Sequence, residues 1–322
     1  MKVGIQCTSY GQRCGISTYS IRLNKYLNQE KDVESFIFVE NPKEDIDVLS
    51  IQYEPGIIPP HVLNEYIRAY VMPIIVVTAH HTRYLSQFYP ILDGVIFHDE
   101  SQIGNEKPWE GGYRIIPHPA LVYPKKNKKS LREKYGLPDD KLIIGTAGFI
   151  TGTGKNLPGI LQHLIKRIDD DMYLYFITSF WKAGDLGRYT QMKNIVKKYK
   201  KEDQVRIDPE FVSDEVLNEK MQACDLLFSW NMTGPNDIGS QSGIASDMYG
   251  SYTKLIVKDS PHYNFIKQQD KVLVGRPNPK DFAEDVLKAA RDADLNDVPD
   301  PTWLSWENQV KYYVDFFKEL LE

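Results

Sequence analysis

Residues 238–263 read IGSQSGIASDMYGSYTKLIVKDSPHY, and the rest of the chain is organised around this stretch. A turn rich in glycine and serine leads into a segment of helical length, residues 244–252, and then into an apolar strand pattern at residues 255–257. Serine hydroxyls and the N–H groups that open a helix are suited to holding a phosphate. The stretch therefore predicts an anion-binding loop, with a plain polar loop as the alternative.

Length and composition indicate a globular enzyme. The chain has 322 residues, of which 42% are hydrophobic and 26% charged, enough for two medium α/β domains. No apolar run approaches the ~18–20 residues of a membrane span, and the chain opens on the strand-like MKVGIQC, so we expect a cytoplasmic protein. The net charge of -5 argues against non-specific coating of nucleic acid. Three cysteines without CxxC spacing predict reduced thiols and no zinc site.

The first half alternates short apolar runs with amphipathic stretches, which is typical of a doubly wound sheet. A strand at residues 3–7 is followed by a glycine-containing loop and a helix at residues 16–27. The loop sequence GQRCGIS is not the GxGxxG fingerprint, so dinucleotide binding is not indicated. Further strands are predicted at residues 35–39, 48–52, 74–78, 94–97 and 115–116.

Polar residues in this half follow the predicted strands. The carboxyl ends of parallel strands meet at one edge of a sheet, so these residues are expected to converge there. Each histidine taken alone is also compatible with a structural role. No HxH or HExxH spacing occurs, and adjacent histidines point in different directions, so we expect no metal site. The residues are Glu54, His80, His81, His98, Asp99 and His118.

Residues 123–141 change in composition to YPKKNKKSLREKYGLPDDK. The stretch is polar, basic and interrupted by prolines, which predicts a linker with one short helix. A solvated surface is the first interpretation of its lysines, and contact with a polyanion or an anionic membrane surface is the alternative.

The second half repeats the alternation. Lys155 stands in the loop GFITGTGKN at the start of a predicted helix, residues 157–168, where a cation can pair with a phosphate. The GxxxxGK[ST] spacing of a P-loop is absent, because Asn156 follows the lysine. Strands are predicted at residues 142–147, 173–178, 205–207 and 225–230, and helices at residues 193–200 and 214–223.

Together these motifs resemble the retaining GT-B glycosyltransferases of the family 4 type. The resemblance covers nearly the whole chain in order, and it implies two Rossmann-like α/β domains on either side of a cleft. The expected domains are residues 1–124 with the C-terminal helix 305–322, which bind the acceptor, and residues 125–304, which bind the donor. The motifs are GISTYS (15–20), IQYEPGI (51–57), VTAHHT (77–82), FHDES (97–101), IPHP (116–119), GFITGTGKN (148–156), QSGIASDMYGSYTKLIVKDSPHY (241–263) and SWENQ (305–309).

The resemblance also implies roles for single residues. Lys155 matches the lysine that contacts the donor diphosphate, and Asp247 the acidic residue that binds the ribose. Gly239 stands where the first glutamate of the family's E-x7-E pair belongs, and Phe149 where many members carry a phosphate-binding arginine. The expected donor-binding residues are Gly15, Lys155, Ser240, Gln241, Ser242, Gly243 and Asp247.

The expected reaction is transfer of a sugar from a nucleotide diphosphate sugar to an acceptor hydroxyl. His80 is the candidate catalytic residue that contacts donor sugar or acceptor, and Glu54 a second candidate. Asp237 and His98 are candidate sugar-binding residues. The resemblance implies retention of configuration. We expect no cofactor and no metal, because no DxD-like carboxylate pair occurs in a suitable setting.

Other interpretations remain open at the level of sequence. The departures at Gly239 and Phe149 are also compatible with a degenerate protein that binds sugar nucleotides without transfer. A GT-B-like epimerase or phosphorylase is a third interpretation. The acceptor is not indicated; hydroxymethylated DNA bases are conceivable beside the lysine-rich segments, although the net charge weighs against nucleic acid.

Overall fold

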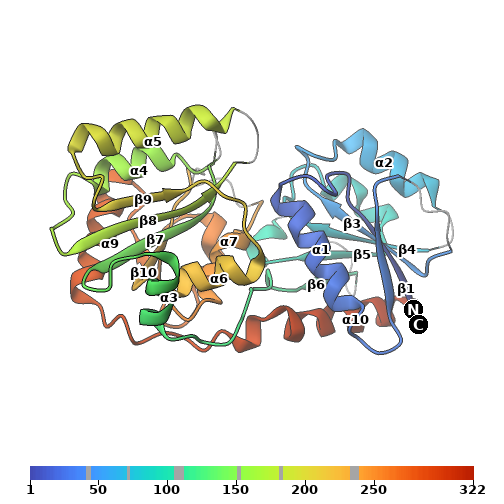
Figure 1. Cartoon of the computed structure of the whole chain (residues 1–322). Coiled ribbons are helices and arrows are strands. Elements are labelled where there is room, and N and C mark those ends of the chain that lie inside the picture. The colour runs from blue at the N-terminus through green and yellow to red at the C-terminus, as the bar shows by residue number, and fades with distance from the viewer. Residues whose placement is uncertain (41–44, 71–72, 105–111, 151–153, 181–183, 233–238) are drawn as a thin grey trace. The chain divides into compact units, whose positions relative to one another are not determined.

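A computed structural model of the protein describes residues 1–40, 45–70, 73–104, 112–150, 154–180, 184–232 and 239–322. The chain divides into two compact units. Unit 1 comprises residues 1–119, 237–241 and 304–322, and unit 2 comprises residues 120–236 and 242–303. Each unit is built on its own parallel sheet (Figure 1).

Unit 1 contains a six-stranded parallel sheet in the order β2-β1-β3-β4-β5-β6. The order reverses direction between β1 and β3. β3 and β4 pair in register from Val48 opposite Ile74 to Tyr53 opposite Ala79, so both strands end at the same level. The strands are β1 (Lys2–Gln6), β2 (Glu34–Phe38), β3 (Val48–Tyr53), β4 (Ile74–Ala79), β5 (Gly94–Phe97) and β6 (Tyr113–Ile115).

Helices cover both faces of this sheet, as the fully buried pattern of β3 requires. Alternate residues of β3, β4 and β5 pack with α2 (Pro60–Ala69) and the 3-10 helix η1 (Ser86–Ile91) in one apolar cluster. The opposite face meets α10 (Trp306–Leu321), whose Phe316 and Leu320 lie against Gly94. α10 also packs on α1 (Gly15–Leu27), and Figure 1 shows α2 and α10 on opposite sides of the sheet.

Unit 2 contains a second six-stranded parallel sheet in the order β12-β11-β10-β7-β8-β9, with the change of direction between β10 and β7. The apolar runs of these strands are buried on both sides, as expected for a parallel sheet. The strands are β7 (Leu142–Phe149), β8 (Met172–Ser179), β9 (Val205–Asp208), β10 (Leu226–Ser229), β11 (Lys254–Lys258) and β12 (Leu273–Gly275).

The helices of unit 2 are placed by local signals at their ends. Asn127 caps α3 and Gly136 ends it in the left-handed conformation with φ 61°, while Asn278 and Pro279 open α9. α4, α5 and α9 share one apolar core with the sheet, and α3 packs against α6 (Figure 1). The helices are α3 (Lys128–Tyr135), α4 (Leu157–Leu164), α5 (Asp185–Tyr199), α6 (Asp214–Gln222), α7 (Gly243–Tyr249), α8 (Asn264–Lys267) and α9 (Pro279–Asp292).

The predicted α/β class and the doubly wound sheets are confirmed, and the strands lie within a few residues of their predicted bounds. Two helices differ. α5 begins at Asp185, not at residue 193, and α7 ends at Tyr249 because Tyr252 adopts φ 54°, outside the helical region. The patterns of α2, α8, α9 and β12 were not recognised in the sequence.

The C-terminal helix α10 belongs to unit 1. One side of this helix is apolar and aromatic. Tyr313, Phe316 and Phe317 are fully buried, whereas Tyr312 is 54% exposed because it lies on the outer side of the helix. None of the helices in the described ranges has both the length and the apolar character needed to cross a membrane.

Candidate functional site

The first candidate region lies where the sheet of unit 2 changes direction, between β7 and β10. In doubly wound sheets ligands bind at this point, beyond the carboxyl ends of the strands. The loop after β7 meets the loop after β10 through a hydrogen bond from the Met232 N–H to the Gly154 carbonyl, 2.6 Å. Lys155 follows Gly154 directly, so the predicted phosphate-binding lysine lies at the switch point.

The backbone of β7 makes room for the Lys155 side chain. Gly148 has φ 119°, a conformation that favours glycine, and a Cβ built there would lie 2.3 Å from Lys155 Nζ and 3.4 Å from Ile244 of α7. The ammonium group therefore occupies the space that any larger residue at Gly148 would fill. The same contacts place it beside the first turn of α7.

The Lys155 ammonium is partly buried, and no hydrogen bond or ion pair to it occurs among the residues that the structure describes. Burial lowers the pKa of Lys155 from 10.5 to about 8. A buried cation without an anionic partner raises the free energy of the folded protein, and an anionic ligand would remove that cost. This lysine is therefore suited to a phosphate.

A second lysine at the same sheet edge was not recognised in the sequence. Lys258 ends β11, is 6% exposed, and donates from Nζ to the Asn231 carbonyl at 2.9 Å. Its ammonium lies 4.8 Å from the centre of the Trp230 ring, and burial lowers its pKa. A charged residue at the end of an otherwise apolar strand, KLIVK, is the signal that could have identified it.

Some polar groups of the glycine and serine loop already form hydrogen bonds within unit 2. Ser242 caps α7 by accepting a hydrogen bond from the Ala245 N–H at 3.3 Å, and its own N–H donates to the His262 carbonyl at 3.1 Å. The Ser242 N–H therefore already has a hydrogen-bond partner within unit 2. Gly243 begins α7, a helix of seven residues. The phosphate contacts predicted for Ser240, Gln241 and Gly243 stay predictions.

Asp247 is 4% exposed and belongs to α7. Its Oδ1 accepts a hydrogen bond from the Leu121 N–H at 2.9 Å, which ties the helix to the segment before the lysine-rich linker. Close packing reinforces this junction, since a Cβ at Gly250 would lie 2.4 Å from the Leu121 carbonyl oxygen. The carboxylate therefore has a structural contact, and its ribose-binding role stays a prediction.

Phe149 stands where the resemblance places an arginine. Its ring stacks on Phe211 with 6.1 Å between ring centres and an interplanar angle of 13°. Phe211 is 49% exposed, so this pair is an apolar surface beyond the end of β7. It brings no positive charge, and Lys155 and Lys258 supply the cations on this side.

In unit 1, Gly239 packs against the turn that follows β4. Its carbonyl accepts hydrogen bonds from the Thr82 N–H at 2.9 Å and from the Gln102 side chain at 3.0 Å, and Ser240 pairs with His81 as an isolated bridge. A Cβ at Gly239 would lie 2.6 Å from the His81 ring. A glutamate at this position would therefore require the His81 ring to move.

The second candidate region is a histidine cluster at the carboxyl edge of the unit 1 sheet. His80, His98 and His118 follow β4, β5 and β6, and their ring centres are 5.0–6.5 Å apart. The Tyr19 ring of α1 lies 4.5–5.6 Å from all three, and its hydroxyl bonds that of Tyr313. Three of the six residues that were expected to converge at this edge therefore lie together. His81 turns away, with Nδ1 accepting from the Arg83 N–H.

Burial keeps two rings of this cluster, those of His80 and His98, uncharged. It lowers the pKa of His80 well below the usual value, with the neighbouring His98 and His118 adding to the effect, and it lowers the pKa of His98 to about 4. Neutral imidazoles donate and accept hydrogen bonds, which suits contact with sugar hydroxyl groups. One ring nitrogen of each histidine lies within 4.8 Å of the others, so the lack of a local spacing motif did not exclude such a cluster.

The remaining predicted residues lie apart from these contacts. Glu54 follows β3, and its carboxylate turns back over its own loop, where a Cβ at Gly56 would lie 2.8 Å from Oε2. Gly15 begins α1 with open space at its Cβ position. Asp237 falls outside the described residues.

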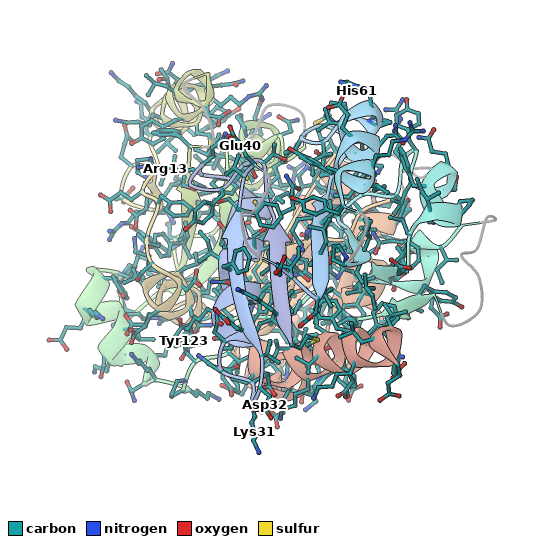
Figure 2. The ribbon with its side chains drawn as sticks, turned by 90° about the vertical axis from the view of Figure 1, so that its right-hand side faces the viewer. Arg13, Lys31, Asp32, Glu40, His61 and Tyr123 are labelled. Carbon is teal, nitrogen blue, oxygen red and sulfur yellow. The ribbon has the colours of Figure 1, made fainter. Side chains whose placement is uncertain are left out.

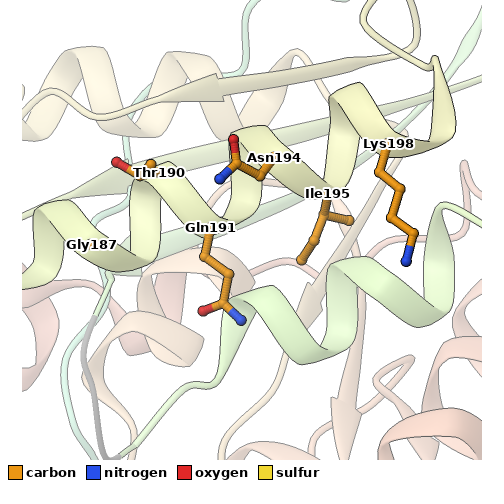
Figure 3. Close-up of a pocket in the computed structure, with 6 residues that line it drawn as sticks. All are labelled: Gly187, Thr190, Gln191, Asn194, Ile195 and Lys198. Carbon is orange, nitrogen blue, oxygen red and sulfur yellow. The ribbon is translucent and has the colours of Figure 1, made fainter.

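Two surface features carry no predicted residue. A hollow of about 290 Å³ runs along α5 (Figure 3), lined by Gly187, Thr190, Gln191, Asn194, Ile195 and Lys198. In the linker, three of the four lysines of residues 125–129 form ion pairs with acidic side chains, which favours the solvated-surface interpretation. The pairs are Lys126 with Glu215 and Glu219, Lys128 with Asp225, and Lys129 with Asp139.

No family model matches the chain, and no curated protein matches it in sequence. Solved structures match it over nearly its whole length. A glycosyltransferase from Rickettsia africae has a TM-score of 0.73 at 12% identity, covering 100% of this chain and 98% of the other. The Anabaena protein Alr3699/HepE in complex with UDP and glucose has a TM-score of 0.67 at 10% identity, covering 98% and 95%.

An α,α-trehalose-phosphate synthase (UDP-forming) from Burkholderia xenovorans, in complex with glucose-6-phosphate, gives a TM-score of 0.68 at 10% identity and covers 99% of both chains. At such identities the likeness concerns the fold. The two doubly wound sheets and the C-terminal helix that returns to unit 1 are those of the GT-B fold.

Proposed function

We propose that this protein is a glycosyltransferase that moves a sugar from a nucleotide diphosphate sugar to an acceptor hydroxyl. The observation that carries the proposal is Lys155, a partly buried ammonium at the switch point of unit 2 with no ion pair among the described residues. A donor diphosphate would supply the missing negative charge. The fold, shared with glycosyltransferases, is consistent with a donor at this edge.

The donor we propose is a UDP-sugar, because solved structures of this fold include complexes with UDP. Lys155 would bind the diphosphate, with the loop at residues 240–243 and Lys258 beside it. A carboxylate can bind the two ribose hydroxyls, and Asp247 is our candidate. The acceptor is a hydroxyl compound, with sugar phosphates as the first class to test, since the Burkholderia enzyme was solved with glucose-6-phosphate.

We propose that transfer proceeds with retention and without a metal at the diphosphate. As the bond to the sugar breaks, negative charge grows on the leaving phosphate, and a positioned ammonium stabilises it more than it stabilises the intact donor. His80 is the proposed contact to the sugar or acceptor, and its neutral ring would accept or donate a hydrogen bond there. We further propose that the transferred sugar is a hexose, that the enzyme is of the family 4 type, and that it is located in the cytoplasm.

The test is release of nucleoside diphosphate from UDP-, GDP- and TDP-sugars in the presence of sugar phosphate, glycan and lipid acceptors. We expect turnover with at least one donor and acceptor pair, unaffected by EDTA. Lys155→Met should abolish most of it. Lys197→Met, which removes an exposed lysine of α5, is the matched control and should leave turnover unchanged. Donor binding without turnover for every acceptor would contradict the proposal.

A second candidate function is binding of a sugar nucleotide without transfer. Two observations favour it: the stacked Phe149 and Phe211 in place of a cationic residue, and the steric exclusion of a glutamate at Gly239 by His81. Under this function UDP-sugars would bind with the same dependence on Lys155, and product would not form.

A further inference from the structure

His80, His98 and His118 bring three imidazole rings together in unit 1, each from the loop after a different strand. One ring nitrogen of each lies within 4.8 Å of the other two. His80 and His118 are partly exposed, whereas His98 is 1% exposed. The cluster therefore combines one buried histidine with two histidines that are partly exposed.

Hydrogen bonds on the outer side of the cluster determine which nitrogen of each ring carries the proton. The Ile116 carbonyl can only accept, so His98 Nδ1, 2.9 Å away, is the donor, and His118 Nδ1 donates in the same way to the Pro119 carbonyl at 3.2 Å. These bonds leave the lone pair of each ring on Nε2.

His80 is oriented by a buried side chain. Gln52 is fully buried, and its amide nitrogen donates to Ser50 Oγ at 3.0 Å, so its oxygen faces His80 Nε2 at 3.1 Å. His80 Nε2 is therefore the donor, and Nδ1 keeps the lone pair. Metal-binding histidines are commonly held in this way, with one N–H given to a carbonyl or amide oxygen.

One of these lone pairs lacks a partner inside the protein. His98 Nε2 is buried and makes no hydrogen bond to any residue in the described ranges. A buried nitrogen without a partner raises the free energy of the folded state unless something binds it. Its position in a cluster of three imidazoles indicates what that ligand is.

We propose that His80, His98 and His118 form a binding site for a divalent transition-metal ion of the zinc class. Imidazole ligands favour Zn²⁺, Co²⁺, Ni²⁺ and Cu²⁺ over Mg²⁺, Ca²⁺ and Mn²⁺, which prefer oxygen. Three protein ligands leave one position of a tetrahedral ion open. Because the three rings bring no negative charge, an anionic oxygen of a ligand or a hydroxide is favoured in that position.

The required movement is small. Tetrahedral coordination with zinc to nitrogen distances of about 2.0–2.1 Å places the nitrogens roughly 3.3–3.4 Å apart. The rings approach from separations of at most 4.8 Å, which rotation of the two partly exposed side chains can close. The sequence predicted no metal site, because it lacks a local histidine spacing motif. The proposed site instead combines histidines from three separate loops.

Cobalt absorption tests the site directly, because Co²⁺ bound by three histidines absorbs visible light far more strongly than the hydrated ion. Protein freed of metal by a chelator and titrated with CoCl₂ should develop these bands with equimolar saturation, and ZnCl₂ should displace them. His118→Ala and His98→Gln should weaken binding by roughly 10–100-fold or more. The glutamine keeps a donor for the Ile116 carbonyl, and a thermal melt without metal establishes that each variant is folded.

His61→Ala is the matched control, because His61 is an exposed histidine at the start of α2 in the same unit (Figure 2). It should bind cobalt as the wild type does. No visible bands in the wild type, or bands that survive in both cluster variants, would overturn the proposal. A separate measurement rests on the proposed function: zinc should inhibit sugar transfer, because the ion would use His80. If zinc binds but does not inhibit transfer, the result would count against the role of His80 in transfer and not against the metal site.

Discussion

The two sheets of this protein have similar architecture and opposite chemistry at their carboxyl edges. In unit 1 the loops after β4, β5 and β6 bring together three imidazoles around Tyr19. In unit 2 the loop after β7 and the last residue of β11 bring two lysine ammoniums, Lys155 and Lys258, to the switch point. The difference shows that the fold provides the place, and the residues that follow each strand determine whether that place is suited to hydroxyl groups, metal ions or phosphates.

The two edges also differ in how they are stabilised without a ligand. Burial lowers the pKa of His80 and of His98, so these two rings are uncharged at neutral pH, and each of the three rings has a carbonyl or amide oxygen as partner. Lys155 is charged at neutral pH, since its pKa is about 8, and it has no partner among the described residues. An anionic ligand should therefore stabilise the folded state more at the unit 2 edge than at the unit 1 edge.

The largest expected effect is that of Lys155→Met on binding of a nucleoside diphosphate. Loss of a charge-assisted contact to phosphate should cost about 1.5–3 kcal/mol, or roughly 10–150-fold in affinity. The same substitution should stabilise the free protein, because it removes a buried cation. Calorimetric titration with UDP and a thermal melt measure the two effects. Weaker binding together with a lower melting temperature would indicate that Lys155 supports the fold instead.

The pH dependence of stability sharpens this prediction. The pKa of Lys155 is lower in the folded state, about 8, than the usual 10.5, so the unfolded chain binds more protons between these values. The free energy of unfolding should therefore gain a contribution that rises from pH 8 to 10.5, by up to about 3 kcal/mol. Lys155→Met should lack this rise in urea titrations compared at the two ends of the window.

A smaller effect is expected from Gly239→Glu in unit 1, which introduces the glutamate that the resemblance places there. Its Cβ would lie 2.6 Å from the His81 ring, so the turn after β4 must move. We expect a loss of about 1–3 kcal/mol in the free energy of unfolding, measured by urea titration. Gly239→Glu combined with His81→Gly should recover part of it. Equal stability of the single variant and the wild type would remove the steric explanation.

The smallest effect is expected from Asp247→Asn. The asparagine keeps an oxygen for the Leu121 N–H and loses only the charge, so the loss of stability should be about 0.5–1.5 kcal/mol. If Asp247 also binds the ribose, uridine affinity should fall more than pyrophosphate affinity. Titration of both ligands into the variant separates the two roles, and unchanged uridine binding would leave Asp247 a purely structural residue.

Much of this arrangement could be predicted from the sequence. Apolar runs separated by polar loops identified the strands, and polar residues after those strands identified the histidine edge, because parallel strands end at a common edge. What the sequence does not carry is side-chain direction. The orientation of His80 depends on Gln52 and Ser50, and the exclusion of a residue larger than glycine at Gly239 depends on His81, contacts between separate segments of the chain.

Lys258 and the structural contact of Asp247 were missed for the same reason. The strand KLIVK shows a charged residue at its end but not the contact of this lysine with the Asn231 carbonyl, and the alignment of Asp247 to a ribose-binding residue gives no sign of Leu121. Roles assigned from a motif thus need the contacts of each side chain before they can be ranked.

The most direct test of the central claim, that the unit 2 edge holds a diphosphate through Lys155, is the number of protons taken up when UDP binds. At pH 8 about half of the Lys155 side chains are uncharged, since the pKa is about 8, and a bound diphosphate would favour the charged form. Calorimetric titrations at pH 8 in buffers of different ionisation enthalpy should give uptake of roughly half a proton per UDP bound. The uptake should vanish in Lys155→Met. Binding without proton uptake, or the same uptake in that variant, would contradict the account.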